Sequence, residues 1–262
     1  MMDINLKVQN LLVSKKYFVK INKRNYKKKY WSKTKDPDGK IRDRLTNHEI
    51  ELKKFVLNNK SLIKRINLLK FRSLCDVGCG SGYLLSQFNN KQIDLLGIDN
   101  DSEAIKIASK YASILKRNLN STNININKKF DLVVCYHVIE QLKNPKKLIK
   151  NLYRLLKKNG ILIIGTPDFD SAMARLYKNK YRMLHDKTHI SLFSKESLIR
   201  FLTDNDFKPI IIDYPYFDTS YFNKKNLLKI FNLKGYSPPF YGNMITIMSK
   251  KNDLIFNFFK II

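Results

Sequence analysis

Three short apolar stretches divide the first half of the chain into a regular series. They run over Phe71–Cys75, Ile93–Ile98 and Phe130–Tyr136, and the last is apolar at nearly every position. Such a run is typical of a strand that is covered on both faces. Segments with the features of helices alternate with these stretches. The alternation predicts an α/β fold built on a parallel sheet.

Capping residues mark where these helices begin and end. Asn100 and Asp101 precede one helix, and Ser194 begins another. Pro145 opens a third helix, which Gly160 is expected to end. Helices are therefore expected over residues 47–66, 102–115, 146–157 and 194–203, and two later strands over 207–213 and 244–249.

The length of 262 residues fits one domain with additions at both ends. We expect a basic arm and loop over 1–46, a domain over 47–251 with an irregular insertion at about 171–193, and an apolar tail over 252–262. The apolar residues of the tail follow the spacing of one helical face. Two alternatives remain for the tail: it docks on the domain, or it joins the arm in holding the chain at an anionic membrane.

A glycine-rich segment follows the first apolar stretch. Gly78, Gly80 and Gly82 alternate with other residues, and a helix is expected to start at Tyr83. Glycines at this point let the backbone turn tightly and lie directly against a ligand. The register of dinucleotide sites fails, because its third glycine would fall on Tyr83 or Leu85.

Two carboxylates flank this segment. Asp76 stands two residues before the first glycine, where it suits a ligand with a cationic ammonium group and would repel a pyrophosphate. Asp99 ends the second apolar stretch, about twenty residues after the glycines, where a carboxylate can accept hydrogen bonds from both ribose hydroxyls. The ligand that fits is an amino-acid-bearing nucleoside, S-adenosylmethionine.

With these features the chain resembles the class I S-adenosylmethionine-dependent methyltransferases. The resemblance runs from about Tyr30 to Lys250. It implies a Rossmann-like, doubly wound, seven-stranded sheet with one reversed strand near the C-terminus. The segments 181–194 and 237–243 resemble methyltransferase-domain proteins of cell-surface polysaccharide and lipid pathways. The cofactor, S-adenosyl-L-methionine, is expected to contact Asp76, Gly78, Cys79, Gly80, Gly82, Asp99, Asn100 and Tyr136.

Histidines near the strand ends are the candidates for a catalytic base. Methylation of an oxygen needs removal of its proton, which favours a group that titrates near neutral pH. His189 is the first choice and His137 the second, with His185 as a third candidate and Asp186 to orient one of them. The alternative is that His137 or His189 only makes a structural hydrogen bond.

A metal ion is not expected. His185 and His189 have helical metal-ligand spacing, but they lack companion residues that would complete a site. In some related ubiquinone-pathway enzymes a metal binds at the end of the fourth strand. Gln141 stands here in place of a histidine that could be a ligand.

The net charge of +28 is unevenly distributed, and about half of it lies in the first 70 residues. Three explanations of this positive charge remain open: a solvated surface with codon bias, contact with an anionic membrane or substrate, and RNA binding. The scarcity of arginine weakens the nucleic-acid alternative. Three cysteines without metal spacing, no signal peptide and no apolar run long enough for a membrane span predict a cytoplasmic protein, with a membrane-peripheral one as the alternative.

These observations predict a methyltransferase that acts on a hydroxyl of a small or lipid-linked acceptor, such as a sugar or quinone-type precursor. Two alternatives stay open. One is an RNA methyltransferase that uses the basic arm, although Tyr136–Ile139 stands where an amino-methylating motif would be. The other is a non-catalytic module that binds S-adenosylmethionine. The oligomeric state is open.

Overall fold

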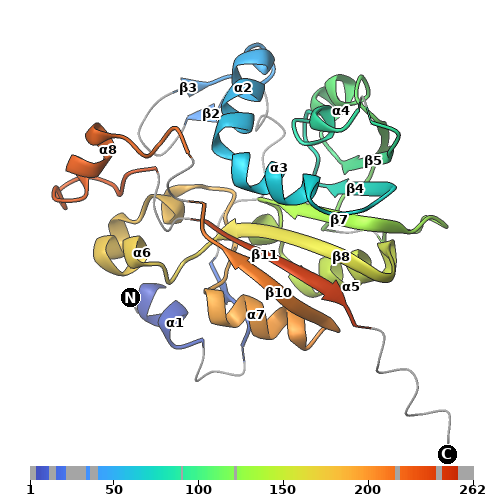
Figure 1. The fold of residues 1–262 in the computed structure, drawn as a ribbon. Coiled ribbons are helices and arrows are strands. Elements are labelled where there is room, and N and C mark those ends of the chain that lie inside the picture. Colours follow the sequence, from blue (N-terminus) through green and yellow to red (C-terminus); the bar gives the residue numbers. More distant parts are fainter. Residues whose placement is uncertain are drawn as a thin grey trace, which may run out of the picture.

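A seven-stranded sheet runs through the middle of the molecule, with helices on both faces (Figure 1). The computed structural model describes residues 4–11, 16–21, 34–35, 41–89, 91–120, 123–215, 219–239 and 244–252. The predicted tail therefore lies outside the described residues, except for its first residue. Much of the predicted arm also lies outside them.

The strand order is β10-β11-β8-β7-β4-β5-β6. Only β11 is antiparallel to its neighbours, β8 and β10. This arrangement confirms the predicted doubly wound fold with one reversed strand near the C-terminus. The strands are β4 Ser73–Val77, β5 Asp94–Asp99, β6 Ser113–Lys116, β7 Phe130–Tyr136, β8 Leu156–Pro167, β10 Phe207–Asp213 and β11 Met244–Lys251.

Alternate residues of the central strands build two separate apolar clusters, because successive side chains point to opposite faces. On one face Leu74 and Leu132 pack in a cluster with Ile66 of α3. On the other, Cys75 and Val133 share a cluster with residues of α5 and α7. The helices are α1 Ile4–Gln9, α2 His48–Asn58, α3 Lys60–Asn67, α4 Ser102–Ala108, α5 Pro145–Leu155, α6 Ala172–Tyr177, α7 Lys195–Thr203 and α8 Lys224–Lys229.

Several predicted helix limits are wrong. The helix expected over 47–66 is interrupted at Asn59, which separates α2 from α3. The helix that begins at Ser102 ends at Ala108, and the apolar residues after it pair with the free edge of β5 as β6. Gly160 lies inside β8, which starts directly after α5. In the last two cases pairing with the sheet overrides local helix signals.

The segment after the glycines also departs from the prediction. It forms turns and one turn of 3-10 helix, η1 (Leu85–Gln87), where an α-helix was expected. In contrast, α7 is capped as predicted. The Ser194 side chain accepts a hydrogen bond from the Ser197 backbone N–H, and the Ser197 side chain accepts one from the Ser194 backbone N–H.

The described part of the predicted arm packs on the domain. Strand β1 (Val19–Lys20) pairs antiparallel with β9 (Ser191–Leu192) inside the predicted insertion. Val8 and Leu11 are almost fully buried. The remaining short elements are β2 Thr34–Lys35, β3 Ile41–Arg42, and the 3-10 turns η2 Ile139–Gln141, η3 Lys178–Lys180 and η4 Arg182–His185.

Candidate active site

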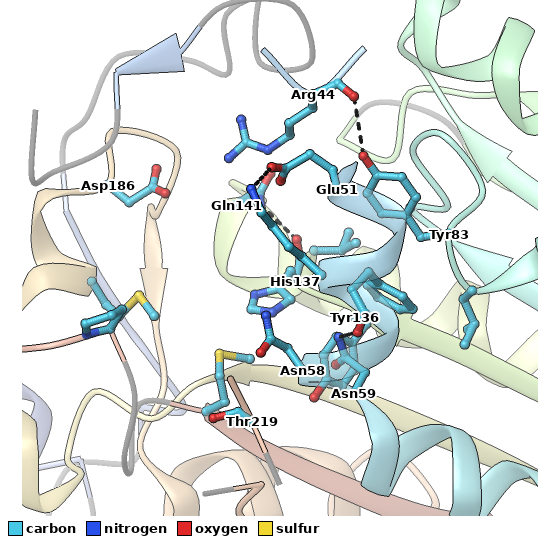
Figure 2. Close-up of a pocket in the computed structure, with 18 of the residues that line it drawn as sticks. Arg44, Glu51, Asn58, Asn59, Tyr83, Tyr136, His137, Gln141, Asp186 and Thr219 are labelled. Atoms are coloured by element: carbon cyan, nitrogen blue, oxygen red, sulfur yellow. Dashed lines mark hydrogen bonds and ion pairs between the residues drawn. The ribbon is translucent and has the colours of Figure 1, made fainter. Parts of the chain in front are cut away.

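A cleft of about 1060 Å³ opens at the carboxyl ends of β4, β5 and β7. Open α/β sheets bind ligands at this edge. Helix α2 and the segment 219–226 supply further walls. Figure 2 shows that residues of α2, the end of β7 and the loop that carries Asp186 converge on one space. Of the predicted site residues, Asp76, Gly78, Cys79, Asp99, Asn100, Tyr136, His137, Asp186 and His189 line it.

The glycine segment lies at the floor of the cleft, and its glycines have left-handed backbone conformations. Gly78 has a φ of 85° and Gly80 a φ of 52°. The Gly80 N–H donates to Asp99 Oδ2 over 2.8 Å, which ties the segment to the end of β5. Gly80 and Gly82 are not among the residues that line the cleft.

The two predicted acidic residues are both buried, but their environments differ. Asp99 accepts three backbone hydrogen bonds, from Gly80, Asn100 and Asp101. No described residue donates a hydrogen bond to Asp76, and burial, followed by the charge of Asp99, raises its pKa from 3.8 to about 7. A buried carboxylate without a donor, facing a cleft, is suited to a cationic group of a ligand. The Asp76 carboxylate therefore fits the amino-acid end of the expected cofactor.

Tyr136 and His137 close strand β7. The Tyr136 hydroxyl lies 3.0 Å from Thr246 Oγ1, and burial raises its pKa to about 12, so its ring rather than its oxygen is available to a ligand. His137 has a φ of 57°, an uncommon value for a residue with a side chain. Its side chain is exposed into the cleft, beside Gln141, whose amide donates to the His137 carbonyl (Figure 2).

His189 is held in one tautomer. Its Nδ1 lies 2.7 Å from the Met183 carbonyl oxygen, which can only accept, so Nδ1 carries the proton. When the ring is neutral, Nε2 holds the free electron pair. Nε2 lies 3.8 Å from Glu140 Oε1 and 3.9 Å from Asp186 Oδ2. Two acidic side chains therefore lie near Nε2.

Glu140 is a site residue that the sequence reasoning missed. It is fully buried, and its Oε2 accepts a hydrogen bond from Thr166 Oγ1 over 2.9 Å. Its Oε1 has no hydrogen-bond partner among the described residues and lies between His137 Nδ1, at 3.7 Å, and His189 Nε2, at 3.8 Å. The available signal was an acidic residue within the apolar run that follows β7, where a charge is costly unless it has a role.

His185 does not belong to this group. It is exposed, its Nε2 contacts the Asn179 carbonyl, and its ring lies 4.4 Å from that of Tyr236. The prediction that it is a candidate base is therefore not supported by its position. His185 is the last residue of the 3-10 turn η4, whereas His189 lies beyond it and contacts the Met183 carbonyl.

The described ranges contain no arrangement typical of a metal site or of a membrane span. No group of three or more His, Cys, Asp or Glu side chains there is arranged to hold a metal ion. None of the helices there is both long and apolar enough to cross a membrane. The three cysteines are buried and unpaired, and burial raises the pKa of each thiol.

Comparisons with known proteins agree with the fold. An uncharacterised protein of Methanocaldococcus jannaschii is 30% identical over 135 residues, 52% of this chain and 64% of that protein. A ubiquinone biosynthesis O-methyltransferase of Rickettsia typhi is 31% identical over 157 residues, 56% of this chain and 61% of that enzyme. The chain thus spans less than two thirds of each of these two relatives.

Among solved structures, an S-adenosylmethionine-dependent methyltransferase of Archaeoglobus fulgidus is similar, with a TM-score of 0.56 and 19% identity, over 80% of this chain and 100% of that one. A family model described as a methyltransferase domain matches residues 48–211, which is more than half of the chain. The chain therefore belongs to the methyltransferase-domain family and has the fold of the class I S-adenosylmethionine-dependent methyltransferases.

Proposed function

We propose that this methyltransferase transfers the methyl group of S-adenosylmethionine to a hydroxyl oxygen of a small acceptor, with His189 as the general base. The observation that carries the proposal is the fixed tautomer of His189. His189 lines the cleft, its Nδ1–H donates to the Met183 carbonyl, and two carboxylates lie close to its Nε2. An imidazole in this state accepts a proton without rearranging.

The chain's residues have separate tasks in this proposal. When bound, S-adenosylmethionine supplies an electrophilic methyl group. Asp76 faces its ammonium group, and Asp99, held by three backbone N–H groups, accepts from its ribose. His189 takes the acceptor's proton at Nε2, and Glu140 and Asp186 stabilise the imidazolium that forms. The remaining rate enhancement would come from positioning the acceptor for an in-line displacement.

Two further points bear on the acceptor, the first on the methylated atom and the second on the charge of the acceptor. The Rickettsia typhi relative is named as a ubiquinone biosynthesis O-methyltransferase, and so is a relative in Glaesserella parasuis that is 28% identical. The cleft lining also includes cationic side chains, among them Arg182 and Lys225, which suit an acceptor with an anionic group. A sugar, a quinone-type precursor and a lipid-linked acceptor all remain within the proposal, as does a cytoplasmic location.

A direct assay tests the acceptor atom. The purified chain is incubated with S-adenosylmethionine carrying an isotope-labelled methyl group and a panel of catechols, sugar phosphates and amines. We expect a methyl ether, identified by mass spectrometry and by the chemical shift of the labelled carbon. Methylation of an amine alone, or of RNA in a parallel reaction, would refute the oxygen assignment and leave the cofactor site unaffected.

The protonation of Asp76 makes cofactor binding depend on pH. Its carboxyl has a pKa of about 7, above its ordinary 3.8, so it is mostly protonated below pH 7. The ammonium group favours the ionised form. We therefore expect the affinity for S-adenosylmethionine to fall as the pH drops below 7, by up to about tenfold per unit. Calorimetry between pH 5.5 and 8 in buffers of different ionisation enthalpy measures both the affinity and the released proton.

Asp76→Asn provides the matched control, since it keeps the shape of the side chain and removes the titration. This variant should bind more weakly at pH 8 and show little change with pH over the same range. If the wild-type affinity is constant from pH 6 to 8, Asp76 does not bind the ammonium group in the way we propose.

A further inference from the structure

The segment 219–237, which contains α8, exposes an unusual number of large apolar side chains. Figure 1 shows α8 at the periphery, apart from the seven-stranded sheet. Leu228 is 61% exposed and Phe231 is 86% exposed. Exposed apolar residues grouped in one segment mark an interaction surface more often than single ones do. The group comprises Phe222, Leu227, Leu228, Phe231, Leu233 and Tyr236.

All the charged residues of the same segment are cationic. It contains four lysines, Lys224, Lys225, Lys229 and Lys234, and no aspartate or glutamate. None of the ion pairs found among the described residues involves these lysines, and all four are exposed. Apolar and cationic side chains are therefore presented together, without compensating negative charge.

The segment is nevertheless anchored to the domain. The Tyr177 hydroxyl of α6 donates to the Lys229 carbonyl over 2.7 Å, and Lys180 Nζ donates to the Leu233 carbonyl over 3.0 Å. Ile230 packs on the apolar cluster that also contains Val8 and Tyr177. These contacts hold the backbone, so the exposed side chains are displayed by an ordered support.

We propose that the segment 219–237 docks on the surface of an anionic lipid bilayer. Apolar side chains displayed beside lysines bind such surfaces, because burial of the apolar groups and attraction to the acidic headgroups act together. A protein partner would have to match four unpaired lysines with acidic groups and also cover the apolar residues. A bilayer meets both demands without a specific shape, and the charge complementarity favours it.

Docking in this way would bring the cleft to the bilayer. One part of the segment lines the cleft, namely Lys225, Asn226 and Lys229. Leu228 and Phe231 do not line it. An acceptor with an apolar tail could then enter from the membrane side. The docking itself is independent of the methyl-transfer chemistry, so its test and the test of the proposed function can fail separately.

Cosedimentation of the full chain with vesicles tests the proposal. We expect binding to phosphatidylcholine vesicles that contain phosphatidylserine, weaker binding to phosphatidylcholine alone, and a loss at high salt. Leu228→Ser with Phe231→Ser should weaken binding to the anionic vesicles on the order of tenfold or more. The control pair Leu68→Ser with Ile210→Ser removes two exposed apolar residues from the end of α3 and from β10, and should bind as the wild type does.

A second pair tests the charge. Lys224→Gln with Lys234→Gln should weaken binding about tenfold or more, whereas Lys208→Gln with Lys250→Gln, on the paired strands β10 and β11, should have a smaller effect. The melting temperature and the affinity for S-adenosylmethionine should be unchanged in all four variants. Absence of vesicle binding, equal loss in the test and control pairs, or binding only to an acidic protein would overturn the proposal.

Discussion

Replacing His189 by alanine is expected to lower turnover about 100-fold or more while leaving the affinity for S-adenosylmethionine nearly intact. The variant keeps Asp76 and Asp99, which we assign to the cofactor. The ring of His189 supplies Nε2, which we propose accepts the proton of the acceptor. Steady-state assays across pH 6–9 check this. The activity that remains should rise with pH, because hydroxide or the ionised acceptor replaces the missing base.

His185→Ala is the matched control for this experiment. It removes a histidine four residues earlier whose ring is exposed and lies outside the cleft. Turnover in this variant should stay within about twofold of the wild type, since surface changes rarely act on a distant site. If His189→Ala retains full activity across the pH range, the role of base belongs elsewhere or the acceptor needs none.

Replacing Gly78 by alanine is expected to destabilise the domain and to abolish measurable cofactor binding. A Cβ at this position would lie 2.1 Å from Val138 Cγ2, and the φ of 85° is strained for any residue with a side chain. Together these effects should cost about 3 kcal/mol or more. In a chain of this length that corresponds to a fall in melting temperature of roughly 6–12 °C.

A double variant separates the two causes. In Gly78→Ala with Val138→Ala the clashing methyl group is gone, so the steric part of the loss should be recovered and the backbone part should remain. Gly235→Ala is the control, because an added Cβ there meets nothing within 4 Å. Unchanged stability and cofactor binding in Gly78→Ala would mean that the glycine segment tolerates a side chain, contrary to our description of the cleft floor.

Local patterns were sufficient where the chain's own residues decide the structure. The limits of β7 and β10 match the predicted apolar stretches, and the Ser194 cap fixes the start of α7. Asp101 likewise caps α4 with two backbone hydrogen bonds. These features depend on neighbours within a few residues, which is why sequence alone predicted them.

The errors concern features that depend on distant parts of the chain. Residues of β6 become a strand because β5 offers them an open edge. Glu140 meets His189 only when the turn after β7 is placed beside the insertion, where the Ile190 N–H donates to the Glu140 carbonyl. His185 and His189 could be told apart only by the Met183 carbonyl and the η4 turn. No spacing rule within one segment contains this information.

The pairing of β1 with β9 has a consequence for how the protein is made. The Tyr17 hydroxyl donates to Asp204, 187 positions later, and Val19 pairs with Leu192 beside the segment that carries His189. Synthesis proceeds at about 5–20 residues per second, so the first segment waits on the order of ten seconds or more for its partner to leave the ribosome. Contacts this distant in sequence also form slowly. We therefore expect the pairing of β1 with β9, beside the segment that carries His189, to form late in folding.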